Sequence, residues 1–383
     1  MKIALVIERL DPRLGGVEQW TWQFTQRLVQ RGHEVHVVAT RFAPETQHAG
    51  IISHSVPAVS SRTKLAEQLE QAVRRLAVDV IHDTGAGWHC DIFQPHGGSR
   101  LASFEQNLLL ESPLLRPIKR GLAPYLPRYR EFDRLMRRQY AGRARTFLAL
   151  SRMVAHDMER FHRVRPEQIR LIYNGVDLER FTPALRSRHR QEQRDRLGVR
   201  DEVLLLIVAH NFELKGVPTL IRTVGLLRRQ GEPVRLAVAG GKRLARYQRL
   251  AEKVGAVAAI TFLGPVVDPA PWYAAADIYV QPTFYDPCSL VVLEALATGL
   301  PVVTSRFNGA GELLTPGIDG YLVQDPADVE ELAQAIRPLL AVDQRMAMSI
   351  AARRLAEQHS LDRNCDQIVA VYLECAGVCS RAA

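Results

Sequence analysis

Short apolar runs alternate with longer amphipathic stretches along most of the chain. The run at 2–8 has the pattern of a strand, and the apolar residues of 17–31 recur at helical spacing on one face. Gly32 ends this predicted helix, and 33–40 is the next predicted strand. Further strands are expected at 78–82, 91–93 and 146–151. Repeated strand–helix units predict a parallel sheet with helices on both faces.

The second half of the chain repeats the scheme. Its expected strands are 203–209, 234–239, 259–263, 277–281 and 301–305. The polar segment 181–200 is expected to be a linker, and 360–375 a helix. We therefore predict an α/β protein with Rossmann-like doubly wound domains at 1–180 and 181–358, and a helix within 359–383 that crosses back to the first domain. Ligands of such sheets bind at the strand C-terminal edges, so a central cleft between the domains is the expected site.

Composition supports this organisation. The 383 residues suffice for two domains, and 47% are apolar. The N-terminus has no apolar signal-peptide region, and the longest apolar runs are too short to span a bilayer. Five scattered cysteines argue against a disulfide framework, and Cys375 and Cys379 have no partners that would complete a metal site. We expect a soluble, reduced, cytoplasmic protein without a bound metal.

The formal net charge is +9, which favours an anionic partner. Much of this charge lies in 113–145, where only Glu131 and Asp133 oppose ten basic residues: Arg116, Lys119, Arg120, Arg128, Arg130, Arg134, Arg137, Arg138, Arg143 and Arg145. Apolar residues lie between the charges: Leu114, Leu115, Ile118, Leu122 and Leu126. The pattern suits a segment that lies on an anionic membrane surface, and it equally suits a solvated basic face.

The most informative segment is 277–305, where a strand pattern ends in a short polar loop before an apolar helix. Ser289 is the expected N-cap, which leaves the amides of Leu290 and Val291 free to bind an anion such as a diphosphate. Glu294 lies among apolar neighbours, where a carboxylate requires a partner, and ribose hydroxyls would provide one. The competing interpretation makes Glu294 an ordinary exposed helix residue.

Another motif follows the expected strand 203–209. Lys215, followed by a glycine, opens a helix, and a lysine there can neutralise a diphosphate leaving group. His210 lies upstream in the same loop, while Lys242 and Arg243 follow the next strand as further candidates for positive charge. A solvated lysine at a helix start would explain the motif equally simply.

Two features mark the first domain. Gly15 and Gly16 would allow a phosphate or sugar close to the backbone, although a tight turn explains them as well. Their spacing is not that of a nicotinamide-cofactor motif. His96 has Gly97 and Gly98 after it and follows the strand 91–93, so it would lie at the sheet edge facing the cleft. It could contact the donor or the acceptor, or be a packed histidine.

The pair Asp286 and Glu294, with seven residues between them and LEALATGLPV from Leu293 onward, resembles the family 4 glycosyltransferases of GT-B fold. The resemblance extends over nearly the whole chain, including the Gly-Gly loop, the Lys215 loop and 174–177. It implies that the first acid lies by the donor sugar, that the second holds the ribose, and that the backbone between them cradles the diphosphate. The implied donor-binding residues are Gly15, Gly16, His210, Lys215, Val266, Asp286, Ser289, Leu290, Val291 and Glu294, and the implied catalytic residues are Lys215, Asp286 and His96. The family usually has Glu where this chain has Asp286, which leaves the donor sugar open.

The resemblance also implies an activity. Within the family, the chain resembles lipopolysaccharide core glucosyltransferase I. The expected reaction moves a hexose, with retention, from a UDP-glucose-type donor to a glycan or lipid-linked acceptor such as lipopolysaccharide core. No metal and no cofactor are expected, and 113–145 is expected to contact the inner face of the cytoplasmic membrane.

Other functions remain as alternatives. A nucleotide-sugar epimerase and a phosphorylase share the two-domain layout, although a phosphorylase would need a pyridoxal lysine that no motif indicates. A basic nucleic-acid-binding protein would use the positive charge. It would also need aromatic residues among the arginines beyond Tyr125, Tyr129 and Tyr140, so we expect no nucleic-acid partner.

Overall fold

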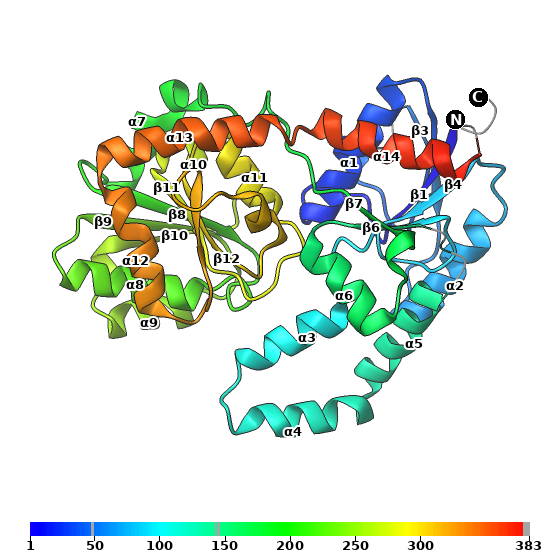
Figure 1. Cartoon of the computed structure of the whole chain (residues 1–383), viewed down its shortest axis with the longest axis horizontal. Coiled ribbons are helices and arrows are strands. Elements are labelled where there is room, and N and C mark those ends of the chain that lie inside the picture. The colour runs from blue at the N-terminus through cyan, green and yellow to red at the C-terminus, as the bar shows by residue number, and fades with distance from the viewer. Residues whose placement is uncertain (47–49, 142–143, 145, 378–383) are drawn as a thin grey trace. The chain divides into compact units, whose positions relative to one another are not determined.

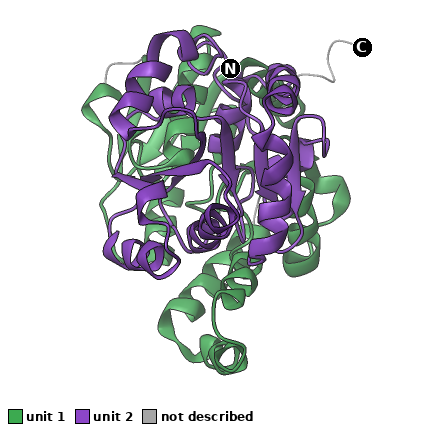
Figure 2. Ribbon diagram, turned by 90° about the vertical axis from the view of Figure 1, so that its left-hand side faces the viewer, with its two compact units in different colours: residues 1–173, 362–383 green, residues 174–361 purple. Residues whose placement is uncertain are grey.

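The computed structural model describes residues 1–46, 50–141, 144 and 146–377, and it divides the chain into two compact units (Figures 1 and 2). Unit 1 comprises Met1–Tyr173 and Asp362–Ala383, and unit 2 comprises Asn174–Leu361. The sequence analysis placed the corresponding boundaries at residues 180 and 358. Arg143, Arg145 and Cys379, which the sequence analysis considered, lie outside the described residues.

Unit 1 is built on a seven-stranded parallel sheet with the order β3-β2-β1-β4-β5-β6-β7. Its strands are β1 (Lys2–Val6), β2 (Glu34–Ala39), β3 (Ile51–Ser55), β4 (Val80–Asp83), β5 (Ile92–Phe93), β6 (Thr146–Ala149) and β7 (Ile169–Leu171). Its helices are α1 (Gly16–Gln30), α2 (Arg62–Val73), α3 (Arg100–Leu109), α4 (Leu115–Leu122), α5 (Pro127–Ala141) and α6 (Arg152–His162), together with α14 (Leu361–Cys375). Short 3₁₀ turns lie at Pro44–Thr46, Ala123–Tyr125 and Pro166–Gln168.

Helices α1 and α14 lie side by side against the unit 1 sheet (Figure 1). The apolar face of α1 places Trp20, Phe24 and Leu28 in the core, each with no exposed surface. Asn364 of α14 accepts a hydrogen bond from the Trp20 indole at 3.2 Å, and the ring of Tyr372 meets that of Phe24 edge-on. The last helix therefore completes the core of unit 1, although it follows unit 2 in sequence.

Helices α3, α4 and α5 form an arm that extends away from the unit 1 sheet (Figures 1 and 2). No residue of α4 is buried, and its N-cap Leu114 is 83% exposed. The base of the arm is anchored where α5 packs against α2, with Leu135 and Met136 buried. No helix within the described residues combines the length and the apolar character needed to cross a bilayer.

Unit 2 has a six-stranded parallel sheet with the order β10-β9-β8-β11-β12-β13. Its strands are β8 (Val203–Ala209), β9 (Val234–Gly240), β10 (Ile260–Gly264), β11 (Ile278–Gln281), β12 (Val302–Ser305) and β13 (Gly320–Val323). Its helices are α7 (Leu185–Leu197), α8 (Val217–Arg229), α9 (Ala245–Lys253), α10 (Ala270–Ala275), α11 (Leu290–Ala297), α12 (Val329–Ile336) and α13 (Val342–Glu357). 3₁₀ turns lie at Val257–Ala259, Gly309–Leu313 and Arg337–Leu340.

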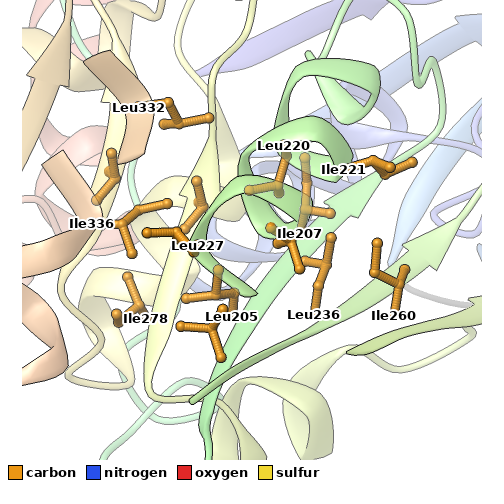
Figure 3. Packing of buried hydrophobic residues seen from close by; sticks show 14 of the residues in the cluster. Leu205, Ile207, Leu220, Ile221, Leu227, Leu236, Ile260, Ile278, Leu332 and Ile336 are labelled. Atoms are coloured by element: carbon orange, nitrogen blue, oxygen red, sulfur yellow. The ribbon is translucent and has the colours of Figure 1, made fainter. Parts of the chain in front are cut away.

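Figure 3 shows the core on one face of this sheet. Alternate residues of β8 pack against helix α8, with Ile207 near Leu220 and Leu205 near Leu227, and Leu332 and Ile336 of α12 belong to the same core. Strand β8 is buried on both faces and consists of one continuous apolar run, as expected for a central strand of a parallel sheet. This packing fixes the strand ends that carry the candidate site.

The expected linker 181–200 is not a linker, because it contains helix α7. The polar residues of this helix include two arginines with a structural role, because Arg190 and Arg194 bind the carboxylate of Asp277 at 2.7 and 2.9 Å. Burial opposes the ionisation of Asp277, but Arg190, the Leu204 amide and Arg194 outweigh it and lower its pKa. This ion-pair cluster attaches α7 to the start of β11.

Candidate donor site at the sheet edge of unit 2

All strands of the unit 2 sheet are parallel, and the order in which successive strands are added changes direction between β8 and its neighbour β11. A ligand crevice is expected outside the C-terminal ends of such a strand pair. The loops there are in close contact, because the Phe284 amide donates to the Leu214 carbonyl oxygen at 2.8 Å. Gly216 has a φ of +75°, and a Cβ there would lie 2.0 Å from the Pro282 carbonyl oxygen. Only glycine allows this approach, which sets the position of the preceding lysine.

Lys215 and Asp286 meet at this edge. The Lys215 ammonium donates to Oδ2 of Asp286 at 2.5 Å, and the two side chains are 21% and 12% exposed. The amide of Gln281 lies 3.4 Å from the same carboxylate oxygen. The Asp286 amide donates a hydrogen bond to the Phe307 carbonyl oxygen, and the Gly309 amide donates one to the Asp286 carbonyl oxygen. A fixed carboxylate therefore holds a cationic group that a diphosphate can also bind.

Helix α11 starts beside this ion pair. Ser289 occupies the N-cap position, as predicted, but its hydroxyl donates to Gln281 Oε1 at 3.2 Å and makes no capping bond. No described side chain caps this helix end. Leu290 and Val291 are half-buried, whereas the rest of the helix is buried. The first amides thus retain donor capacity and the positive end of the helix dipole, a combination that binds anions.

Glu294 is a buried carboxyl group and not an exposed helix residue. It is 5% exposed and accepts a hydrogen bond from the Tyr273 hydroxyl at 2.9 Å. Burial raises its pKa to about 7, and the Tyr273 hydrogen bond and the charge of Arg180 only partly offset this effect. A carboxyl group behind an uncapped helix start can accept hydrogen bonds from ligand hydroxyls.

The other residues predicted in this unit are more open. His210 is exposed after β8, as are Lys242 and Arg243 after β9, and Val266 is half-buried after β10. All four lie in loops that leave the same C-terminal edge of the sheet. Within the described residues, none of the four forms a hydrogen bond or an ion pair with Lys215 or Asp286 through its side chain.

Three further residues organise the site and were not predicted. The Asn308 side chain accepts hydrogen bonds from the amides of Ser289 and Ala310 at 3.3 and 3.1 Å. Asn174 donates to the Cys288 carbonyl oxygen at 2.8 Å. Gln281 contacts both the Asp286 and Ser289 side chains. Their polar side chains next to strand ends were the available signal, but Asn308 and Asn174 have partners 19 and 114 residues away in sequence.

In unit 1 the predicted glycines lie after β1. Gly15 precedes the first residue of α1, and Gly16 is that first residue. A Cβ at Gly15 would lie 3.0 Å from Oε2 of Glu18. No side chain caps this helix end in the described part of the chain. The geometry accommodates a close ligand and equally a tight turn.

His96 lies after β5 in a partly buried position. Its ring is 4.3 Å from that of Trp20, and Nε2 is buried without a hydrogen-bond partner among the described residues. Burial, with a smaller contribution from His82, lowers the pKa of His96 to about 3, so the ring is neutral. His82 itself binds the Tyr372 hydroxyl through Nδ1 at 2.6 Å. A neutral His96 can donate to or accept from a sugar hydroxyl.

Within the described ranges, no group of three or more His, Cys, Asp or Glu side chains is arranged to hold a metal ion.

Both halves of the chain match known protein families. Residues 14–180 match the family model described as Glycosyltransferase Family 4, and residues 202–342 match the model described as Glycosyl transferases group 1. A D-inositol 3-phosphate glycosyltransferase from Corynebacterium urealyticum is 30% identical over 254 residues, or 63% of this chain and 59% of that protein. The chain therefore spans about three fifths of that curated relative.

A second relative matches the chain both in sequence and in its solved structure. The lipopolysaccharide glucosyltransferase WaaG of Escherichia coli is 27% identical over 241 residues, covering 61% of this chain and 64% of that protein. A crystal structure of WaaG matches with a TM-score of 0.80 at 21% identity, over 97% of this chain and 99% of that chain. HepE from Anabaena, solved with UDP-glucose, matches with a TM-score of 0.74 at 18% identity, over 97% and 99%. These likenesses confirm the predicted pair of parallel-sheet α/β domains.

Proposed function

The chain belongs to the family 4 glycosyltransferases and has their GT-B fold, and from this premise we propose that it transfers a hexose from a nucleotide-sugar to a glycan or lipid-linked acceptor. One observation carries the proposal. Lys215, Asp286 and the uncapped start of α11 lie where the strand order of unit 2 changes direction between β8 and β11, with the buried carboxyl of Glu294 on the same helix.

Each part of a nucleotide-sugar has a partner in this arrangement. The diphosphate binds the amides of Leu290 and Val291 together with Lys215, and the ribose binds Glu294. The sugar lies by Asp286, while the backbone of Val266 contacts the base. UDP-glucose is the proposed donor, since WaaG is named as a glucosyltransferase and HepE was solved with UDP-glucose.

The reaction exchanges one bond for another at the anomeric carbon. The bond from this carbon to the diphosphate oxygen breaks, and the acceptor oxygen attacks from the same face. The departing phosphate takes the proton of the acceptor hydroxyl, so configuration is retained. Lys215 and the α11 amides stabilise the charge that develops on the diphosphate, the role that a metal ion serves in other transferases. This chemistry requires no cofactor.

Unit 1 supplies the remaining groups of the proposal. The neutral ring of His96 contacts the donor sugar, and the backbone at Gly15 and Gly16 approaches the substrate closely. The acceptor binds to this unit, with lipopolysaccharide core as the class suggested by the WaaG relative.

We further propose that the arm formed by α3–α5 contacts an anionic membrane. Leu114, Ile118 and Tyr125 are 83%, 57% and 78% exposed, which gives the arm an apolar surface. Lys119 and Arg120 pair with glutamates, whereas Arg130 and Arg134 have no ion pair among the described residues. Each basic residue near anionic lipid contributes about 1 kcal/mol.

The donor assignment is tested by thermal shift with a panel of UDP-, GDP- and ADP-sugars, followed by transfer assays and NMR of the anomeric product. We expect selective stabilisation by UDP-glucose. We also expect Lys215→Ala to lower turnover by about two orders of magnitude. Lys253→Ala, which removes an exposed lysine from α9, is the control and should leave turnover unchanged. Full turnover in Lys215→Ala, or conversion of the donor without an acceptor, would contradict the proposal.

Membrane contact is tested by sedimentation with phosphatidylglycerol and phosphatidylcholine vesicles. The double variant Leu114→Ser/Ile118→Ser should lose binding to the anionic vesicles. Ile350→Ser, at a residue of α13 that is 58% exposed, is the matched control. Equal and negligible binding to both vesicle types would exclude the contact.

A further inference from the structure

Three arginines of unit 1 surround one aromatic ring. The guanidinium carbons of Arg62, Arg100 and Arg128 lie 5.2, 4.7 and 5.7 Å from the centre of the Phe132 ring. The ring can attract each cation through its electron-rich face, but it carries no net charge to neutralise them. Three positive charges are therefore held close together around an uncharged aromatic ring.

Little negative charge opposes this cluster. Glu8 lies 3.8 Å from Arg62 and 3.8 Å from Arg9, so it is shared. Neither Arg100 nor Arg128 has an ion pair anywhere in the described ranges. Partial burial, followed by repulsion from Arg62, lowers the pKa of Arg100, although the group stays cationic.

The nearest acid on α5 is already engaged. Glu131 accepts a hydrogen bond from the Ser61 hydroxyl at 2.6 Å and another from the Thr63 amide at 3.3 Å. Its carboxylate thus serves the first turn of α2. Glu131 keeps its negative charge, but in the described ranges it forms no ion pair with any of the three guanidinium groups, which outnumber the nearby carboxylates Glu8 and Glu131.

The position of the cluster relates it to the sheet edge. Arg62 and Arg100 are the first residues of α2 and α3, the helices that follow β3 and β5. Helices that follow parallel strands begin at the C-terminal edge of the sheet, the edge that also carries His96 and the loop of Gly15.

We propose that Arg62, Arg100 and Arg128 form a binding site for an anionic group, a phosphate or a carboxylate, of the acceptor. This inference rests on the proposed function, in which unit 1 binds the acceptor. Guanidinium groups bind phosphate and carboxylate through paired hydrogen bonds, and an anion would relieve the repulsion among the three cations. The substrate class is therefore a negatively charged acceptor and not a neutral glycan.

Inorganic phosphate is the first probe, titrated calorimetrically into the full chain at low ionic strength with UDP present at saturation. The UDP occupies the anion site of unit 2. We expect saturable binding that Arg100→Gln weakens about tenfold. Arg128→Gln, at an exposed position, should have a similar effect and guards against misfolding. Arg137→Gln is the matched control, because Arg137 is 78% exposed on the same helix, pairs with Asp133 and does not contact Phe132.

Anionic vesicles form the second arm, because a lipid headgroup offers the same phosphate chemistry. If Arg100→Gln weakens binding to phosphatidylglycerol vesicles more than Arg137→Gln does, the headgroup is a source of the bound anion and the site stands. If it weakens only phosphate binding, the site stands and the source is a soluble phosphate. Equal losses in Arg100→Gln and Arg137→Gln in both arms, or no effect of Arg100→Gln in either, would overturn the site. Both arms are independent of turnover, so a failed transfer assay would count against the proposed function alone.

Discussion

Replacing Glu294 with glutamine should separate the stability of unit 2 from its binding of the donor. In the unliganded chain, burial raises the pKa of this carboxyl group to about 7 from an ordinary value of 4.5. Glutamine has nearly the same shape and can still accept the Tyr273 hydrogen bond, which measures 2.9 Å in the structure. It cannot ionise, so the substitution removes the titration and little else.

The size of the expected stability difference follows from the number of protons that the folded and the unfolded chain bind. Between pH 4.5 and about 7 the folded chain keeps a proton on Glu294 that the unfolded chain has released. The wild-type chain therefore loses stability as the pH rises through this window, by about 3 kcal/mol in total. The variant escapes this loss. We expect its free energy of unfolding to exceed that of the wild type by about 2–3 kcal/mol at pH 8 and by about 1 kcal/mol or less at pH 5.

Donor binding should change in the opposite direction. A carboxylate accepts from two ribose hydroxyls, so the variant should bind UDP-glucose about tenfold or more weakly. The affinity of the wild type should rise about tenfold between pH 6 and pH 8, because Glu294 must ionise to bind. Urea unfolding at pH 5–8 and calorimetry with UDP-glucose test both statements. Parallel stability profiles for the two proteins, or undiminished affinity in the variant, would refute the reasoning.

Further substitutions test the supporting structure. Asp277→Asn should lower the free energy of unfolding by about 3–5 kcal/mol at pH 7, because it leaves the arginines of α7 buried without their carboxylate. Because the folded pKa of Asp277 is lowered, this deficit should shrink below pH 3.8; a constant deficit in thermal unfolding from pH 7 to pH 3 would contradict the ion pair. Gly216→Ala should cost about 2 kcal/mol or more, from a positive φ and from contact with a carbonyl oxygen. Gly231→Ala has a similar φ of +84° and open space around its Cβ, so it measures the backbone strain alone, and equal losses would rule out the contact. Tyr372→Phe should lower stability by about 1–2 kcal/mol in urea unfolding, because it removes the partner of His82; unchanged stability would argue against that hydrogen bond.

Much of the fold could be predicted from hydrophobic patterns. The strands around 203–209 and 277–281 are buried on both faces, so their apolar runs carried a strong signal. The three strands that the sequence analysis omitted, β3, β7 and β13, all lie at sheet edges. Edge strands expose more of their side chains and therefore have weaker patterns; none of the five residues of Ile51–Ser55, for example, is buried.

The candidate site was predictable only where the signal was local. Asp286, Ser289 and Glu294 lie in one strand–loop–helix segment, so the sequence indicated their proximity. Their partners Tyr273 and Asn308 come from neighbouring elements, and these contacts span 21 and 19 residues of sequence, which no local pattern indicates. The helix at 185–197 was missed for the same reason, because its polar face binds a carboxylate that is distant in sequence.

The membership of α14 in unit 1 has a consequence for synthesis on the ribosome. Unit 2 is one continuous stretch, Asn174–Leu361, so it can fold as soon as it has left the exit tunnel. Unit 1 is translated first, but the indole of Trp20 and the ring of His82 gain their partners Asn364 and Tyr372 only when the last helix is made. Unit 1 is therefore synthesised first but completes its folding last. While unit 2 is being translated, the nascent unit 1 carries an apolar surface that α14 will later cover.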